Sequence, residues 1–324
     1  MKLNTGMRCH DLCEKMEMEK VFQLAKENGV HQIQLAFAKS ISNYDFTTGH
    51  YNPGFARYIK EQLDKNEIHV AVLGCYINPT NPVEELRKKE VARFIEHLKY
   101  ARIIGADMIG TETGRLSSDF RVTPETYSED GYQLLLKSMR EIVSAAEKLG
   151  VIVGVEGVFD HTLYSPARMK RFLDDIDSPN VEVILDSVNL IHPDEVAPEA
   201  QERVVRQAFE YYGDRISALH VKDFVFDGQN QLFRHVGEGL FCYEPLMKLI
   251  KEKKLISRCC LKTPAENVST AMWPSCRRFM TGYNKKNRNR RMIPDNSARW
   301  KGQSWPGFFT SFCETTPASL HTPG

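Results

Sequence analysis

The stretch VIVGVEGVFDH, Val151 to His161, joins a buried segment to a charged one. Five apolar or Gly residues lead directly into Glu156. A short apolar run of this kind predicts a buried strand. A carboxylate at its end must be paired, bound to a metal or neutralised, because an isolated buried charge is costly. We interpret His161, which closes the stretch, as a loop residue rather than a ligand.

Similar β-rich runs recur along the chain, and segments with helical spacing separate them. Their starts lie roughly 30–45 residues apart, about the length of one βα unit. The runs are 1–7, 31–37, 69–77, 107–113, 151–158, 181–188, 216–224 and 255–262. Eight strands alternating with helices predict a closed (β/α)₈ TIM barrel, an α/β fold. An open doubly wound sheet is the alternative, but it would need a Gly-rich phosphate loop after an early strand, and the sequence has none there.

Residues typical of helix starts and helix ends lie between the runs and support this alternation. A polar residue followed by Pro suits the start of a helix, and Gly suits its end. The predicted helix starts are Asn81-Pro82, Thr123-Pro124, Ser165-Pro166 and Thr263-Pro264. The predicted helix ends are Gly29, Gly105, Gly150 and Gly213.

Composition excludes several functional classes. Net charge is +1 over 324 residues, so charge gives no argument for nucleic acid or a membrane surface. No apolar run approaches the ~20 residues of a membrane span, and the start lacks the long apolar centre of a signal peptide. The 8 Cys are scattered without a C-x-x-C pair, which predicts free thiols. We therefore expect a cytoplasmic protein.

Polar residues that follow the predicted strands indicate a site. In a TIM barrel the chemistry lies at the carboxyl ends of the strands. These ends carry Glu112, Glu156, Asp186 and His220, with Lys222 just after the last of them. Two carboxylates and an imidazole predict a divalent-metal site, and oxygen-rich ligation favours manganese or magnesium. The alternative is that these acids form structural ion pairs with Arg102, Arg115, Lys222 or Arg234.

The motif order VGVEGV, VILDSVN, HVKD and RHVGEGLFCYEPL resembles the sugar phosphate isomerase/epimerase group of xylose isomerase-like TIM barrels. This group includes tagatose and psicose 3-epimerases. The similarity covers roughly residues 1–266. It implies that Glu156, Asp186 and His220 are metal ligands and that Glu156 is also the catalytic base.

The resemblance also assigns substrate contacts and shows one departure. It implies that Arg234 contacts substrate. Lys222 and His235 are further candidates for contact with substrate or phosphate, and Glu112 is expected at the mouth of the barrel. Asn189 stands where several epimerases carry a substrate-binding His. On the last strand the group has a fourth ligand Glu, but CCLKTPAENV places Lys262 at that position. An ammonium group beside a divalent ion is mainly repulsive, which puts activity in question.

The segment 267–324 differs from the barrel, 1–266. It holds all three Trp, and between Arg277 and Lys301 there are nine basic residues and one acid without an apolar period. Three interpretations stay open: a basic arm for RNA or an acidic partner, a disordered extension, or a shifted reading frame near Ser257. We expect an irregular tail in each case.

The resemblance implies a metal-dependent sugar or sugar phosphate isomerase/epimerase of carbohydrate metabolism. Its reaction would be proton transfer next to a carbonyl, through a metal-stabilised ene-diolate. The partner would be a small sugar, with a homo-oligomer left open and no nucleic acid. Two alternatives remain: an endonuclease IV-like phosphodiesterase, and a non-catalytic or impaired barrel because of Lys262.

Overall fold

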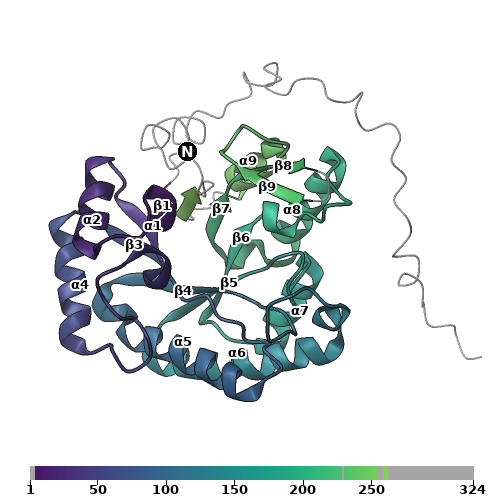
Figure 1. Cartoon of the computed structure of the whole chain (residues 1–324). Helices are drawn as coiled ribbons and strands as arrows, with labels where there is room; N and C mark the ends of the chain where they lie inside the picture. Colours follow the sequence, from purple (N-terminus) through teal and green to yellow (C-terminus); the bar gives the residue numbers. More distant parts are fainter. Residues whose placement is uncertain (1–3, 228–229, 254–257, 262–324) are drawn as a thin grey trace, which may run out of the picture. The chain divides into compact units, whose positions relative to one another are not determined.

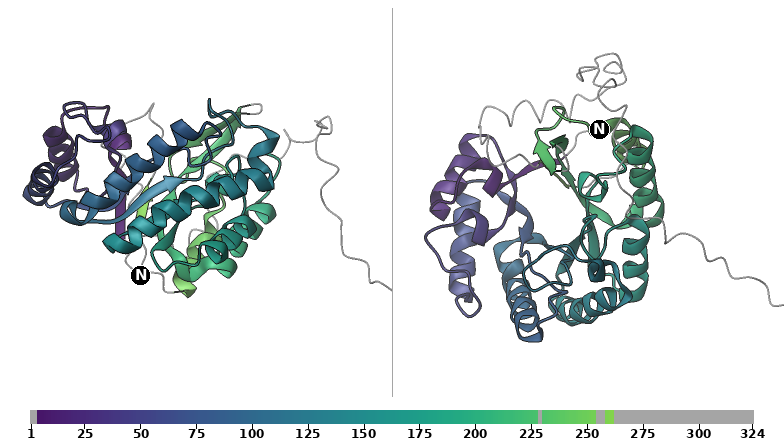
Figure 2. Two further views of the ribbon diagram at one scale, coloured as in Figure 1. Left: turned by 90° about the horizontal axis from the view of Figure 1, so that it is seen from below. Right: turned by 45° about the vertical axis from the view of Figure 1, so that its right-hand side comes forward.

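A closed barrel of eight parallel strands forms the centre of the computed structural model, which describes residues 4–227, 230–253 and 258–261. Helices surround the strands (Figure 1) and keep to the outside of the barrel from two further directions (Figure 2). The barrel strands are β1 (Asn4–Arg8), β2 (Gln32–Leu35), β3 (His69–Gly74), β4 (Ala106–Glu112), β5 (Ile152–Glu156), β6 (Val181–Asp186), β7 (Ile216–Val221) and β10 (Arg258–Leu261). The predicted TIM barrel is therefore confirmed.

Strand order follows the chain, and the barrel closes where β10 pairs with both β1 and β7. The helices are α1 (Cys9–Leu12), α2 (Met18–Glu27), α3 (Phe37–Ser40), α4 (Pro53–Lys65), α5 (Glu84–Ile104), α6 (Glu129–Leu149), α7 (Pro166–Ile176), α8 (Pro198–Tyr212) and α9 (Tyr243–Glu252). Short 3₁₀ turns are η1 (Pro124–Tyr127), η2 (Val188–Leu190) and η3 (Gly213–Arg215). Among the described helices, none is long and apolar enough to cross a membrane.

A hairpin that the sequence analysis did not predict follows β7. It consists of β8 (Asp223–Asp227) and β9 (Asn230–Arg234), which pair in antiparallel fashion. The buried Asp223 carboxylate holds the loop that follows the hairpin, because it accepts hydrogen bonds from the backbone N–H groups of Gly237 and Phe241 at 3.1 and 2.8 Å. The segment after the hairpin is thereby tied back to the start of β8, which follows the end of β7.

Local capping confirms some of the predicted boundaries and corrects others. Ser165 caps α7 as predicted, since its Oγ accepts the N–H of Arg168 at 3.2 Å. Gly105 and Gly150 end α5 and α6 with the left-handed backbone that Gly tolerates.

Two of the predicted boundaries were wrong, and a third was right in position but not in conformation. The helix predicted after Asn81 begins only at Glu84, because the Asn81 side chain closes a turn onto the Val83 N–H. Thr123-Pro124 opens only the short turn η1, and Ser128 caps α6 instead. Helix α8 does end before Gly213 as predicted, but Gly213 has φ −53° and starts η3, so it lacks the left-handed backbone expected of a terminal Gly. The boundary at Thr263-Pro264 lies outside the described residues.

The core has two parts. A large apolar cluster fills the space between strands and helices, and a smaller one fills the barrel interior. The inner cluster comprises Val72, Met108, Ile184 and Ala218, with Ile152 packed against it. Gly110 and Gly154 face the same interior, where an added Cβ would lie 2.7 Å from Val72 Cγ1 and 2.7 Å from Met108 Sδ respectively. These glycines leave room for the larger side chains of a layer that forms the floor beneath the strand ends.

Candidate metal centre

Three adjacent strands present their terminal polar residues to the barrel interior. Side chains alternate between the two faces of a strand, so residues two or four positions from an interior residue are also interior. Glu156 is four residues from Ile152, while Asp186 and His220 are two residues from Ile184 and Ala218. Asp186 and His220 are also direct partners in the β6–β7 register. The same period that builds the inner apolar layer therefore brings these side chains together above it.

The three side chains converge as the sequence analysis predicted. One ligand atom from each of Glu156, Asp186 and His220 lies within 4.8 Å of the others, and all three residues are buried. His220 Nδ1 lies 3.0 Å from Glu156 Oε2. Two ligand atoms about 2.1 Å from one ion and about 90° apart are separated by roughly 3 Å. The donor set and this separation fit a divalent cation, and no other such group occurs in the described part of the chain.

Asn189 and Lys222 surround the two carboxylates. Asn189 Nδ2 donates to Glu156 Oε1 at 2.8 Å, and its backbone N–H donates to Asp186 Oδ1 at 3.1 Å. Lys222 Nζ donates to Asn189 Oδ1 and lies 3.3 Å from Asp186 Oδ2. Both residues are buried. The ion-pair alternative is thus realised where Lys222 meets Asp186, whereas Arg115 pairs with Asp160 instead.

The remaining predicted residues occupy different positions. Glu112 is half-buried and lies opposite Glu156 in the β4–β5 register. Arg234 ends the hairpin, and its guanidinium donates to the carbonyl of Phe233 at 3.0 Å. His235 is buried, and burial lowers its pKa. Lys262 lies outside the described residues, as does the whole segment 267–324.

Residues on the opposite wall were missed by the sequence analysis. Arg8, the last residue of β1, forms two 2.6 Å contacts with Asp11. Burial acts to lower the Arg8 pKa, but the Asp11 carboxylate, with smaller contributions from Tyr76 and Glu156, raises it overall. The charge of Glu156 is therefore near enough to act on Arg8. Arg8 could have been found by the strand-end rule that identified the acids, had β1 been extended by one residue.

His161 occupies a loop, as predicted, but a buried one. Its pKa is lowered to about 4, mainly by burial, with smaller effects from Asp160, Arg115 and Glu156. Arg115 connects this loop to the one after β4, since it contacts Asp160 Oδ2 at 2.5 Å and donates to the Phe120 carbonyl at 2.7 Å. His161 therefore stays neutral at physiological pH within a firmly connected pair of loops beside Glu156.

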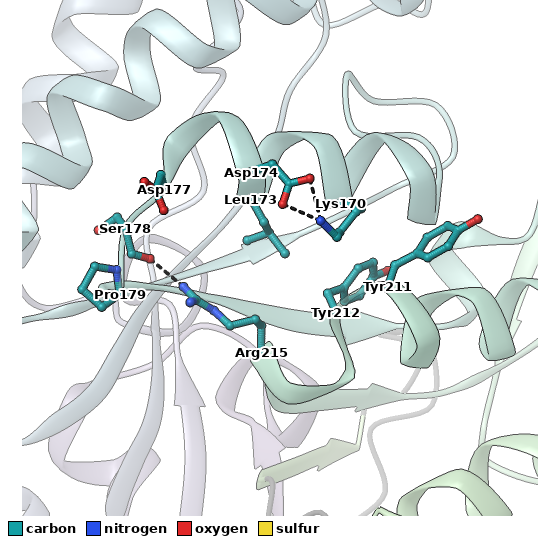
Figure 3. A pocket seen from close by; sticks show the side chains of 9 residues that line it. All are labelled: Lys170, Leu173, Asp174, Asp177, Ser178, Pro179, Tyr211, Tyr212 and Arg215. Carbon is teal, nitrogen blue, oxygen red and sulfur yellow. Dashed lines mark hydrogen bonds and ion pairs between the residues drawn. The ribbon is translucent and has the colours of Figure 1, made fainter.

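A hollow lies away from the carboxyl ends of the strands, where the candidate metal centre is. Its volume is about 650 Å³, and Figure 3 shows residues of α7, α8 and the segments before β6 and β7 around it. Three of its charged groups are already engaged: Lys170 pairs with Asp174, and Arg215 donates to the Ser178 carbonyl at 2.6 Å. Because it is lined from the amino ends of β6 and β7, it is separate from the candidate metal centre.

The family comparison agrees with the motif order. The family described as "Xylose isomerase-like TIM barrel" matches residues 22–282, which is most of the chain. No curated protein matches the sequence significantly.

Many solved structures share the fold. A 3-keto-D-glucoside 4-epimerase from E. coli, in its apo form, is 14% identical with a TM-score of 0.64, covering 87% of this chain and 100% of that one. A D-psicose 3-epimerase from Clostridium cellulolyticum H10, solved with D-tagatose, is 16% identical with a TM-score of 0.60, covering 81% and 85%. The IolI protein with a bound zinc atom is 13% identical with a TM-score of 0.63, covering 86% and 96%. At identities this low, the structural similarity establishes the fold alone.

Proposed function

Because the chain belongs to the xylose isomerase-like TIM barrel family, we propose that it is a divalent-metal-dependent sugar or sugar phosphate isomerase/epimerase. The observation that carries the proposal is the buried convergence of Glu156, Asp186 and His220 at adjacent strand ends. Sugar epimerases among the structures with this fold support the substrate class. The substrate is a small sugar carrying a carbonyl.

The residues have separate roles in this proposal. Glu156, Asp186 and His220 hold the ion, which when bound supplies Lewis acidity to the substrate's carbonyl and hydroxyl oxygens. Glu156 is the base that takes the proton from the carbon next to the carbonyl. The inner apolar layer below closes the site to water from the far end of the barrel. Oxygen-rich ligation favours manganese or magnesium, although one protein with this fold was solved with zinc.

The proposal is tested with metal-free protein, to which manganese, magnesium or zinc is returned separately. Each form is incubated in D₂O with a panel of ketoses and ketose phosphates that includes tagatose, psicose and ribulose. We expect metal-dependent epimerisation, with deuterium incorporated at the carbon next to the carbonyl. Turnover that is independent of metal, or a product without deuterium, would contradict the proposed chemistry. Cleavage of abasic DNA in place of ketose turnover would favour the phosphodiesterase alternative.

A metal-binding but impaired barrel is the second candidate, and Lys262 favours it. The family resemblance places a fourth ligand Glu where this chain has Lys262. We therefore expect Lys262→Glu to raise the affinity for manganese and to create or increase ketose turnover. Titration of bound manganese and the same ketose assay measure both effects. A fall in both quantities would instead make Lys262 a working acid/base, and no change in either would place it away from the site.

A further inference from the structure

We propose that Asn189 is a positioning residue that holds both carboxylates of the candidate metal centre, and that Lys222 fixes the direction of its amide. The sequence analysis made both residues candidates for substrate contact. The contacts of Asn189 support another role, because its polar atoms point to the two acids and to Lys222. The inference concerns the metal centre itself and rests on the proposed function only for its kinetic readout.

Asn189 contacts the two acids through different parts of its structure. It lies in the 3₁₀ turn η2, which begins one residue beyond the end of β6 and brings its backbone N–H to within 3.1 Å of Asp186 Oδ1. Its side chain extends to the neighbouring strand, where Nδ2 donates to Glu156 Oε1 at 2.8 Å. A single residue therefore fixes one oxygen on each of two acids that belong to different strands.

Lys222 determines which way the amide faces. An ammonium group can only donate hydrogen bonds, and a carboxylate can only accept them. Lys222 Nζ donates to Asn189 Oδ1, so the Asn189 NH₂ group is directed to Glu156. A reversed amide would place its oxygen against the carboxylate and its NH₂ against the ammonium. Since all of these groups are buried, such an arrangement would leave unpaired polar atoms at considerable cost.

Lys222 is itself held in place. The Tyr243 hydroxyl donates to its backbone carbonyl at 2.9 Å, and its Nζ lies 3.7 Å from the centre of the Phe233 ring on the hairpin. A chain of hydrogen bonds therefore runs from the fixed Lys222 ammonium through the Asn189 amide to Glu156 Oε1. The other oxygen, Oε2, lies beside His220. Asn189 is only 6% exposed and both ends of its amide are engaged, which argues against substrate contact.

The test uses Co²⁺ alone as a probe of the metal centre, through its affinity and its visible absorption spectrum. Asn189→Leu keeps the approximate shape but removes the donor and the acceptor. Loss of a partner that orients a metal ligand typically costs about 10–100-fold in affinity. We expect a loss in this range, an altered Co²⁺ spectrum and, with an active ketose, a lower kcat and a KM within about twofold of wild type. The smaller Asn189→Ser, which leaves room for water, is expected to give the same changes and serves if the Leu variant fails to fold.

The matched control is Asn180→Asp, which removes an amide donor at the opposite end of β5, where Asn180 Nδ2 contacts the Val151 carbonyl at 2.9 Å. It should leave the affinity and spectrum of Co²⁺ unchanged. Wild-type affinity and spectrum in the Asn189 variants would overturn the proposal, and a raised KM at unchanged affinity would assign Asn189 to the substrate. If no ketose is turned over by wild type, the proposed function fails, while the Co²⁺ measurements still decide the role of Asn189.

A double-mutant cycle tests the role of Lys222, because removing its charge would by itself change the affinity for the ion. If Lys222 fixes the amide, Asn189→Leu should cost less Co²⁺ affinity in a Lys222→Met background than in wild type. Equal costs in the two backgrounds would remove Lys222 from the proposal and leave Asn189 to be judged by its own variants.

Discussion

His220 Nδ1 lies 3.0 Å from Glu156 Oε2, and both side chains are completely buried. The two residues belong to β7 and β5, which are separated by β6 in the barrel, so their contact depends on the curvature of the sheet. This distance suits two neighbouring ligands of one ion. It also suits a buried ion pair in which His220 carries a proton, and metal binding distinguishes the two interpretations.

Glu156→Gln keeps the shape of the side chain but removes its charge. We expect manganese affinity to fall by more than the roughly 10–100-fold that loss of an outer-shell partner costs. Equilibrium dialysis with metal analysis measures the change. The control is Glu182→Gln on β6, whose carboxylate accepts from Ser217 Oγ at 3.0 Å and lies toward the other end of the barrel. Equal affinities for the two variants would favour the ion-pair interpretation.

Arg115→Met should destabilise the protein by about 2–3 kcal/mol, since hydrogen bonds to charged, part-buried groups contribute about that much. Arg115 and Asp160 are each only 19% exposed, and Arg115 also donates to the Phe120 carbonyl. Denaturant unfolding gives the change in the free energy of unfolding. Arg206→Met, which removes an exposed pair with Glu202, should cost no more than about 0.5 kcal/mol. A similar small cost for Arg115 would show that the two loops are not held by this contact.

His97 should make the protein less stable in acid. Its pKa is lowered to about 4, first of all by burial, while its contact with the Arg93 carbonyl acts in the opposite direction. The unfolded chain, with a His pKa of about 6.5, then binds the proton more readily, so stability falls as the pH drops from about 6.5 to about 4. The full effect is about 3 kcal/mol at most.

Denaturant unfolding at several pH values, for wild type and His97→Gln, measures this effect. The variant should lose that part of the pH dependence. An unchanged slope in His97→Gln would show that other groups account for the acid sensitivity.

Gly110→Ala should disturb the inner apolar layer. The added Cβ would lie 2.7 Å from Val72 Cγ1 and 2.9 Å from Ile184 Cδ1, and overpacking of this kind costs about 1–3 kcal/mol. Thermal unfolding detects the loss. Gly213→Ala, where the nearest atoms are 3.9 Å away and φ is −53°, should change stability little. Tolerance of Ala at position 110 would mean that the layer has room to adjust.

Most barrel strands were predictable because they are short apolar runs between helical segments, as VIVGV before Glu156 illustrates. The strand-end rule then identified Glu156, Asp186 and His220. The hairpin β8–β9 was not predicted, since the run 216–224 continues into it without a break, and the bonds of the buried Asp223 carboxylate to Gly237 and Phe241 are contacts between residues far apart in the chain. Gly213 follows α8 as predicted, but its local sequence does not reveal that η3 follows without a left-handed residue.

The sequence alone determined the alternation of strands and helices and the types of residue at the strand ends, because both depend on local periodicity. Only the tertiary structure decided which groups meet. Asn189 lies three residues after Asp186, at the end of β6. Its side-chain amide nevertheless donates to Glu156 on β5 and accepts a hydrogen bond from Lys222, which follows β7. Such contacts depend on the register between strands and on barrel closure. Residues far apart in the chain set both, and no local pattern encodes them.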